Sequence, residues 1–418
     1  MTDVIDASAD APGTAPPRPT GEPPALEVTD LTVDFPSDDG AVHAVRGVSY
    51  SLARGETIAI VGESGSGKSV TSLAIMGLLP RNAKISGSVR LAGREILGLS
   101  EGQLRGIRST KISMIFQDPI SSLNPVYTVG WQVRETLRAH NPDMSRQDLR
   151  DRSVELLRLV NIPNAEQRVD QYPHEFSGGM RQRAVIAIGI ANDPDVIIAD
   201  EPTTALDVTI QAQVLETLAL AQQETGAAMA LITHDLGVVA GVADRVMVMY
   251  AGTPVEFGDV EDIYYRPHMP YTVGLLGSLP RMDARDQDRL TPIQGAPPSL
   301  VNLPPGCPFG PRCPLHQSRC DEQEPPLRTA PGLGHTAACW YSEKLDAVGL
   351  DANDLFTDDT DDDLDDLDAD DLDDADDADD AAGAVGADAG AAPVPPVGAA
   401  QPSTPLDATR PGAVRSDS

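Results

Sequence analysis

The sequence predicts an α/β protein with a mainly parallel β-sheet, and three features support this fold class. Short apolar runs at Thr57–Val61, Val196–Ala199 and Met229–Thr233 have the length of buried strands. Each run is followed by polar residues, which are a glycine-rich segment, a carboxylate pair and a His-Asp pair, respectively. Because the carboxyl ends of parallel strands lie at one edge of a sheet, these polar segments are expected to face a common crevice.

The first polar segment is "GESGSGKS", which fits the phosphate-loop pattern G-x-x-x-x-G-K-[ST]. It lies between a strand and the helical pattern "SVTSLAIMGLL", a context that a chance glycine-rich turn would not require. Its backbone N–H groups would surround a β-phosphate, Lys68 would reach the β- and γ-phosphates, and the Ser69 hydroxyl would ligate Mg²⁺. The expected nucleotide contacts are Gly62, Glu63, Ser64, Gly65, Ser66, Gly67, Lys68, Ser69 and Val70.

The carboxylate pair is Asp200 and Glu201, at the end of "DVIIADEP". Asp200 is expected in the Mg²⁺ shell, and Glu201 is expected to polarise the attacking water as general base. An acidic pair with a structural role is the alternative, which the neighbouring phosphate loop disfavours.

His234 lies at the tip of the third strand, in "MALITHDLG". A neutral imidazole at this edge would hydrogen-bond the γ-phosphate and orient the water, and the alternative is a core histidine with satisfied hydrogen bonds.

A second anion-binding element is predicted in "FSGGMRQR", where Ser177, Gly178 and Gly179 begin a helix. If the helix after the phosphate loop and this helix lie on separate subdomains, the N-terminus of this helix cannot reach the phosphates that the chain's own loop holds. The helix would therefore reach only the nucleotide of a partner chain.

These segments resemble the motifs of ABC-type ATPases, and the resemblance covers about residues 26–280. The matching segments, in chain order, are "GESGSGKS" (Walker A), "IFQDP" with Gln117 (Q-loop), "FSGGM" (signature), "VIIADEP" (Walker B), "TALD" with Asp207 (D-loop) and "THD" with His234 (switch histidine). The resemblance implies a P-loop NTPase core with an antiparallel β subdomain and a helical subdomain at about 118–185. It also implies that Gln117 contributes to catalysis and to the Mg²⁺ site, and that Asp207 contacts nucleotide. The signature has Phe176 and Met180 where Leu and Gln are common, and keeps the Ser-Gly-Gly core.

Longer segments are similar to the D-type ATP-binding subunit of oligopeptide/dipeptide importers. They are "IFQDPISSLNP", "FSGGMRQR", "ADEPTTALDVTIQAQVL", "RPHMPYTVGLLGSLP" and "PPGCPFGPRCP". The resemblance implies an ATPase that powers peptide import at the cytoplasmic face of the membrane. Its partners would be a second ATPase subunit (an F-type subunit or another copy), two permeases and an external solute-binding protein. Gln117 would relay hydrolysis to the permeases.

Other classes of ABC ATPase remain alternatives. An importer of nickel or another small solute belongs to the same subfamily. A soluble ATPase of DNA repair would carry a long insertion before the signature, but only 107 residues separate Ser69 from Ser177. A translation-associated protein would carry two cassettes, and the chain shows one.

Two aromatic residues have alternative interpretations. The resemblance places Phe35, before the first hairpin, as the residue that stacks on adenine, and an ordinary core aromatic is the alternative. Trp131 would line the permease-facing surface of the helical subdomain or lie in its core.

All four cysteines lie near the C-terminal end of the folded part, at Cys307, Cys313, Cys320 and Cys339, with the spacing C-x5-C-x6-C-x18-C. Their Pro- and Gly-rich surroundings offer little core, so a staple is expected. In a cytoplasmic protein thiolate ligation is favoured over disulfides. The absence of C-x2-C knuckles weakens the case for zinc, and four thiolates with Cys-Pro steps at Cys307 and Cys313 favour a [4Fe-4S] cluster. Zinc, with His316 or His335 as alternative ligands, and free thiols remain alternatives.

The chain has 418 residues and a net charge of −33, and its composition indicates which terminal segments do not fold. From residue 341 onward there are 23 Asp or Glu and 3 Lys or Arg, so a disordered acidic tail is expected at 343–418. A disordered Pro-rich leader without signal-peptide features is expected at 1–25, the cassette at 26–280 and a small Cys-containing module at 281–342. The negative charge disfavours nucleic acid as a partner, and no apolar run is long enough to span a membrane.

Overall fold

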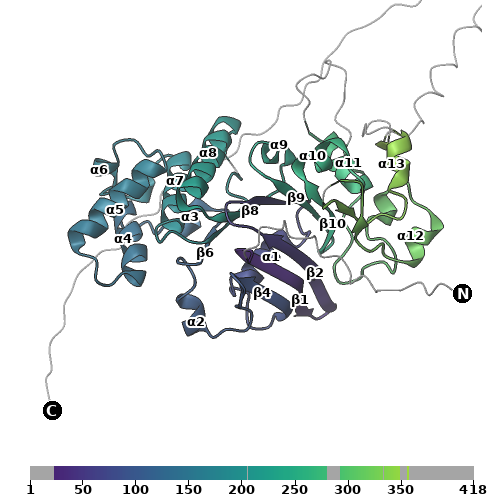
Figure 1. Ribbon diagram of the computed structural model, residues 1–418, viewed down its shortest axis with the longest axis horizontal. Coiled ribbons are helices and arrows are strands. Elements are labelled where there is room, and N and C mark those ends of the chain that lie inside the picture. The colour runs from purple at the N-terminus through teal and green to yellow at the C-terminus, as the bar shows by residue number, and fades with distance from the viewer. Residues whose placement is uncertain (1–22, 205, 280–291, 333, 349–354, 357–418) are drawn as a thin grey trace, which may run out of the picture. The chain divides into compact units, whose positions relative to one another are not determined.

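The centre of the larger β-sheet is parallel (Figure 1). The computed structural model describes residues 23–204, 206–279, 292–332, 334–348 and 355–356. In spatial order the parallel strands are β6 (Ile112–Ile115), β7 (Val196–Asp200), β8 (Ala228–Thr233), β3 (Thr57–Val61) and β9 (Arg245–Tyr250). The three apolar runs of the sequence lie in β3, β7 and β8, and every residue of these strands is buried.

Alternate residues of the parallel strands enter two different cores. Val196 and Ile198 of β7 pack in the core shared with the smaller sheet, whereas Ile197 and Ala199 pack with the helices of the opposite face. Both faces of the sheet are therefore covered, which explains why its strands are apolar without alternation.

The smaller sheet is antiparallel and consists of β2 (Gly40–Leu52), β1 (Leu26–Ser37), β4 (Lys84–Leu91) and β5 (Arg94–Glu95), in that order. Its buried face includes Leu31 and Val48, which share a core with Ile58 and Ile60 of β3. The hairpin between β1 and β2 brings Phe35 opposite Val42.

Helices between β6 and β7 form the helical subdomain. They are α3 (Pro119–Ser122), α4 (Val129–His140), α5 (Arg146–Leu159), α6 (Ala165–Arg168), the 3₁₀ helix η1 (Pro173–Glu175) and α7 (Gly178–Gly189). Helix α7 contacts α3, α4, α5 and β6. Thr128 and Ser145 cap α4 and α5 by accepting backbone N–H groups, as N-cap residues do.

Six further helices lie outside the helical subdomain and the C-terminal end of the described chain. They are α1 (Lys68–Ile75), α2 (Glu101–Arg105), α8 (Val208–Thr225), α9 (Leu236–Val239), α10 (Val260–Tyr265) and α11 (Pro270–Gly277). Helix α8 also contacts α7, so the helical subdomain packs against the parallel core.

The C-terminal module is defined here as residues 292–348. It contains the 3₁₀ helix η2 (Gly310–Arg312), α12 (Ser318–Glu322), β11 (Arg328–Thr329), β12 (Thr336–Ala337) and α13 (Glu343–Val348). β12 pairs with β10 (Thr253–Asp259), which pairs with β9, so the module extends the larger sheet to eight strands in the described part of the chain. Tyr250, Tyr271 and Phe309 form an aromatic cluster that joins the module to the cassette.

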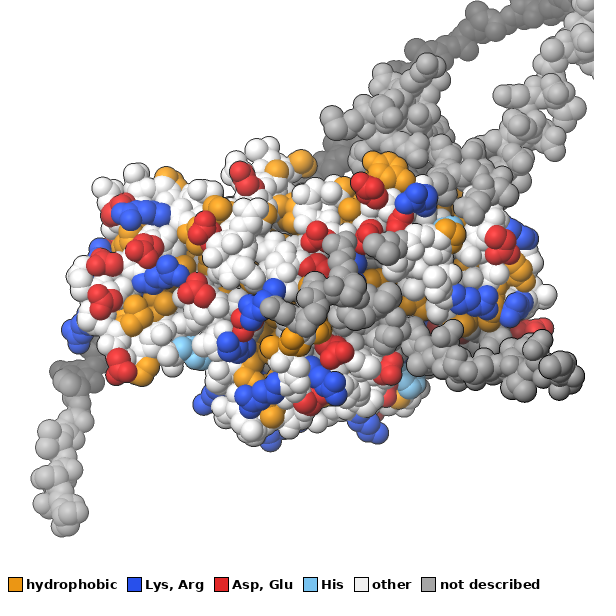
Figure 2. Space-filling model, viewed as in Figure 1, with side chains coloured by type: hydrophobic (Ala, Val, Ile, Leu, Met, Phe, Trp, Pro, Cys, Tyr) orange, Lys and Arg blue, Asp and Glu red, His pale blue; other side chains and the backbone are white. Residues whose placement is uncertain are grey.

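The predicted leader at 1–25 lies almost wholly outside the described residues, as does most of the predicted acidic tail. In the visible face of Figure 2, acidic and basic side chains are interspersed over the described elements. Within the described ranges, no helix combines the length and the apolar character needed to cross a lipid bilayer.

Candidate nucleotide-binding site

A cavity of about 740 Å³ lies at the carboxyl edge of the parallel strands. Because β3, β7 and β8 are adjacent, the polar residues that follow them meet at this edge, as the sequence predicted. The residues that line the cavity are Phe35, Val42, Ala44, Ser64, Gly65, Ser66, Gly67, Lys68, Ser69, Val70, Gln117, Glu201, His234 and Leu300.

The phosphate loop requires glycine where its backbone is close to neighbouring strands. Gly62 has φ +144°, and a Cβ at this position would lie 2.2 Å from the carbonyl oxygen of Met249. Gly67, just before α1, has φ +100°, and its Cβ would lie 2.5 Å from the carbonyl oxygen of Ala44. The loop therefore presents backbone to the cavity, in the form that cradles phosphate groups.

Lys68 is buried beneath the loop, and its ammonium group bonds to the loop backbone. Nζ donates to the carbonyl oxygens of Gly62 at 2.7 Å and Glu63 at 2.9 Å. Burial lowers the pKa of Lys68, and the nearby carboxylates of Glu201, Asp200 and Glu63 oppose this shift. Nζ also donates to the Ser66 hydroxyl at 3.3 Å, so the cation has only neutral hydrogen-bond partners, which it can exchange for phosphate oxygens.

Ser69 and Asp200 form the pair expected for a Mg²⁺ site. The Ser69 hydroxyl donates to Oδ1 of Asp200 at 2.9 Å. Burial raises the pKa of Asp200, and Glu201 adds to this effect, while Ser69 and Lys68 oppose it. Oxygen donors beside a phosphate loop suit Mg²⁺. A bound cation would also offset the free-energy cost of burying the charged Asp200 carboxylate. These two residues therefore fit the ion that the loop implies.

Glu201 is the centre of a polar network in the cavity. Its Oε2 accepts hydrogen bonds from Gln117 Nε2 and from Thr204 Oγ1, both at 2.9 Å. His234 Nδ1 lies 3.4 Å from the same oxygen. Glu201 has φ +46°, a left-handed conformation that is rare for residues other than glycine and is often found at functional sites. The structure thus brings together the predicted base, the switch histidine and the Q-loop glutamine.

The signature residues and Asp207 do not line this cavity. Ser177 caps α7 by accepting the N–H of Met180 at 3.4 Å, and Asp207 caps α8 by accepting the N–H of Ile210 at 3.0 Å. A Cβ at Gly179 would lie 2.7 Å from Ile210, so this glycine permits close packing of α7 on α8. In the single chain these residues are accounted for by helix capping and packing.

Phe35 lies at the hairpin end of the cavity and is half-buried, at the edge of the core. The sequence did not indicate Thr204 or Leu300 as site residues. Thr204 bonds the predicted base, and Leu300, from the C-terminal module, lines the cavity together with Phe35 and Val42. The Leu300 carbonyl accepts the N–H of His43 at 3.1 Å, which holds the module against the hairpin.

The four cysteines come together in the C-terminal module, with free thiols. Burial raises the pKa of Cys307 to about 11 and those of Cys313 and Cys339 to about 12, and neighbouring thiols add to each shift. Backbone N–H groups face these three sulfurs, among them that of Tyr341, which lies 3.4 Å from Cys339 Sγ.

The described residues contain no group of three or more His, Cys, Asp or Glu side chains placed to hold a metal ion. The two alternative ligands differ in availability. His335 uses both ring nitrogens, at 3.0 Å from the Pro331 carbonyl oxygen and 2.9 Å from Glu256 Oε1. His316 Nε2 lies 2.9 Å from Asp321. His335 is therefore committed to a buried ion pair and does not serve as a zinc ligand in this structure.

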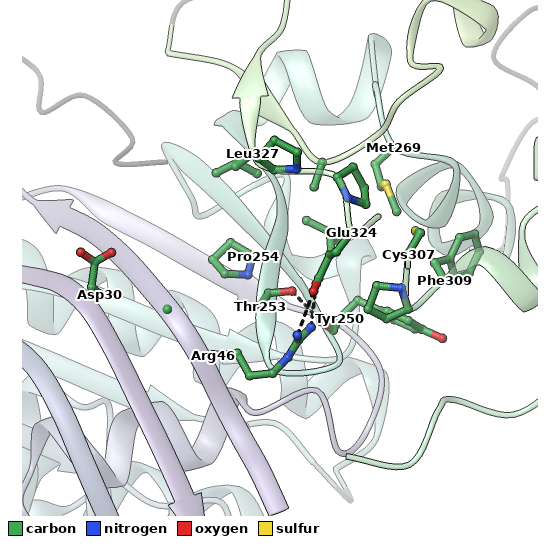
Figure 3. A pocket seen from close by; sticks show the side chains of 16 residues that line it. Asp30, Arg46, Tyr250, Thr253, Pro254, Met269, Cys307, Phe309, Glu324 and Leu327 are labelled. Carbon is green, nitrogen blue, oxygen red and sulfur yellow. Dashed lines mark hydrogen bonds and ion pairs between the residues drawn. The ribbon is translucent and has the colours of Figure 1, made fainter. Parts of the chain in front are cut away.

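A second cavity, of about 400 Å³, lies where the module meets β2 and β10 (Figure 3). It contains none of the predicted nucleotide ligands, and its walls are mostly apolar, including Met269, Phe309 and Leu327. Arg46 crosses it to form two hydrogen bonds with Glu324, at 2.8 and 3.0 Å. This cavity is a junction between module and cassette, stabilised by an ion pair.

Sequence comparison identifies the two parts of the chain separately. The family described as "ABC transporter" matches residues 45–204, and "Oligopeptide/dipeptide transporter, C-terminal region" matches residues 255–320. Among solved structures, a dimeric post-hydrolysis state of the ATP-binding cassette MJ0796 bound to ADP and phosphate has a TM-score of 0.51 and 27% identity. The alignment covers 56% of this chain and 98% of that one. The fold and the site therefore define an ATP-binding cassette of the ABC class, with its antiparallel and helical subdomains, as the sequence predicted.

Comparison with curated relatives identifies the family within the ABC class. The dipeptide transport ATP-binding protein DppD of Bacillus subtilis is 53% identical over 76% of this chain and 95% of its own length. The oligopeptide transport ATP-binding protein OppD of Escherichia coli is 51% identical over 73% of this chain and 90% of its own. OppD of Mycobacterium tuberculosis is 54% identical over 80% of this chain, but the match spans only about half, 54%, of that relative. The chain belongs to the family of oligopeptide and dipeptide transport ATP-binding proteins.

Proposed function

We propose that the chain is an ATPase subunit that powers the import of oligopeptides or dipeptides through membrane permeases. The observation that carries the catalytic part is the placement of Glu201. Its carboxylate lies in the same cavity as the phosphate loop, is held by Gln117 and Thr204, and lies beside His234. The family relatives support the peptide substrate.

In this proposal each group of cavity residues has a separate role in ATP hydrolysis. The loop backbone and Lys68 bind the phosphates, while Ser69 and Asp200 hold Mg²⁺, which supplies charge stabilisation when bound. Glu201 accepts a proton from the attacking water, and Gln117 and His234 orient that water and the carboxylate. Phe35 contacts the adenine end. The chemistry requires positioning and charge rather than a covalent intermediate.

We propose that Ser177, Gly178, Gly179 and Asp207 act on the nucleotide of a second ATPase subunit. They lie outside this chain's own cavity, and the structurally similar cassette is described as dimeric. The second subunit is an F-type homologue or another copy of this chain. Closure around two nucleotides and reopening after hydrolysis would then couple the ATPase to transport.

An exposed apolar surface near the Q-loop supports contact with permeases. Val126, Tyr127 and Trp131 are partly or largely exposed, and the rings of Tyr127 and Trp131 stack with centroids 3.9 Å apart. Apolar residues gathered in this way mark interaction surfaces. We propose that the chain binds two permeases here, at the cytoplasmic face of the membrane, and serves an external solute-binding protein through them.

We propose that the cassette spans 26–280, with its helical subdomain at about 118–185, and that the Cys-containing module spans 281–342. The four cysteines of that module are proposed to hold a [4Fe-4S] cluster, with zinc as the alternative. The N–H groups facing three sulfurs support thiolate ligation. Against it, the described residues show no group of three or more side chains placed to hold a metal ion, and the raised thiol pKa values mean that binding must release protons and move the thiols together. Iron and acid-labile sulfide analysis after anaerobic purification tests this. A colourless protein with stoichiometric zinc would support the alternative, and a metal-free protein would exclude both.

The transport assignment is tested by uptake in cells that lack the chain. Restored uptake of labelled di- and oligopeptides, lost again with Glu201→Gln, is the expected result. Restored uptake of nickel and not of peptides would assign the chain to the small-solute branch of the subfamily. Copurification with DNA or ribosomes instead of permeases would contradict an importer.

A further inference from the structure

The phosphate loop carries a carboxylate that is paired with the C-terminal module. Arg312 donates to Glu63 through both terminal nitrogens, at 2.7 and 2.9 Å. The Arg312 side chain is only 5% exposed, and its other hydrogen bonds go to Tyr250 OH, the carbonyl oxygen of Gln294 and that of Ile293. A buried guanidinium with this set of partners is fixed in position, and the two-point contact fixes the carboxylate with it.

The negative charge of Glu63 is unfavourable for binding phosphate groups at the loop. It directly follows Gly62, and the carbonyl oxygens of both residues accept hydrogen bonds from Lys68, the cation that reaches the phosphates in the proposed function. An unpaired carboxylate here would repel the phosphate groups of a nucleotide and compete for Lys68. Pairing with Arg312 cancels that charge.

The loop backbone is also held by helix α11 of the cassette, against which the C-terminal module packs. The N–H of Glu63 donates to Tyr271 OH at 2.8 Å, and Tyr271 packs against Tyr250 and Phe309. Phe309 and Arg312 lie in the segment between Cys307 and Cys313, so the cysteine-bearing loop is joined to the phosphate loop. At the other end of the cavity the module contributes Leu300.

We propose that Arg312 is a positioning residue of the nucleotide site, which neutralises Glu63 and fixes the start of the phosphate loop. The C-terminal module thereby forms part of the nucleotide site of its own chain. This proposal rests on the proposed binding of ATP.

The test is the dissociation constant of Mg²⁺-ADP, which is not hydrolysed, measured by calorimetry on the full-length chain. Arg312→Met is expected to raise it about tenfold, the scale of one unneutralised charge close to the phosphates. The double variant Arg312→Met with Glu63→Gln is expected to return it to within about threefold of wild type, because the repelling charge is gone. Arg319→Met, which removes an exposed arginine that lies over the Trp340 ring of the same module, is the matched control and is expected to bind as wild type.

A second readout separates positioning from catalysis. In ATPase assays Arg312→Met is expected to raise KM about tenfold and change kcat less than about twofold. Wild-type affinity in Arg312→Met, or equal weakening in the single and double variants, would overturn the role of Arg312. Failure of the wild-type chain to bind ADP at all would instead overturn the proposed function.

Discussion

Replacement of Glu201 by glutamine tests the assignment of the general base, and the structure predicts a chemical effect with little structural change. Glutamine has the same shape, and its side-chain oxygen still accepts hydrogen bonds from Gln117 and Thr204, each 2.9 Å long in the wild type. The φ of +46° is unaffected by the exchange, because both residues carry the same strain. The variant therefore loses a proton acceptor and one negative charge.

The expected loss of rate in Glu201→Gln follows from the contribution of a general base. A positioned base contributes about 10²–10⁴-fold to a rate, which corresponds to about 3–5 kcal/mol in the activation free energy. ATP binding should persist or tighten, because a carboxylate near the phosphates has been neutralised.

The assay measures phosphate release under saturating ATP, together with ATP affinity in the same preparation. Glu216→Gln, on the exposed face of α8, is the matched control and should keep wild-type activity. If Glu201→Gln kept more than about a tenth of the wild-type kcat, a role as general base would be refuted.

Three further predictions concern the loop, the signature helix and the module. Gly67→Ala places a Cβ 2.5 Å from the Ala44 carbonyl oxygen at φ +100°, so we expect ADP affinity to fall more than about tenfold by calorimetry. Ser177→Ala removes a long 3.4 Å capping bond, so the free energy of unfolding should fall by about 0.5–1 kcal/mol, as measured by urea denaturation. Ser177→Thr keeps the cap and should keep the stability. Burial is the largest single effect and lowers the pKa of His335, but the bond and charge of Glu256, with Pro331 and Asp262, together raise it overall. Its stabilising contribution is therefore present below about pH 6.5 and is lost as pH rises through the folded-state pKa. Urea denaturation from pH 5.5 to 9 should show this decline, and an equal decline in His335→Asn would contradict it.

Local sequence patterns were sufficient for the parallel core and for most of the cavity. A strand, a glycine-rich loop and a helix are contiguous in sequence, so the positions of Lys68 and Ser69 follow from geometry over a few residues. Asp200, Glu201 and His234 could be placed because each lies at or just after the end of a strand of a parallel sheet, and such strand ends share one edge. The family resemblance added Gln117, whose Nε2 donates a hydrogen bond to Glu201 in the structure.

The contributions of the C-terminal module were not predictable in this way. Arg312 and Glu63 are 249 residues apart, and a single arginine among prolines and glycines carries no periodic or motif signal. Leu300 likewise lines the cavity only because its backbone carbonyl bonds the β1–β2 hairpin. The cysteine spacing predicted a set of metal ligands, and the described residues show no group of three or more side chains placed to hold a metal ion. Spacing alone does not distinguish iron from zinc or from free thiols.

The pairing of β12 with β10 also affects how the protein can be handled. Glu256 and Phe257 of β10 lie opposite Ala337 and Thr336 in the antiparallel pair, and Phe257 is buried. A chain truncated near residue 280 would present this strand with unsatisfied N–H and C=O groups beside uncovered apolar side chains, which is a template for edge-to-edge association. Such a truncated cassette is expected to aggregate through this edge, which β12 covers in the longer chain.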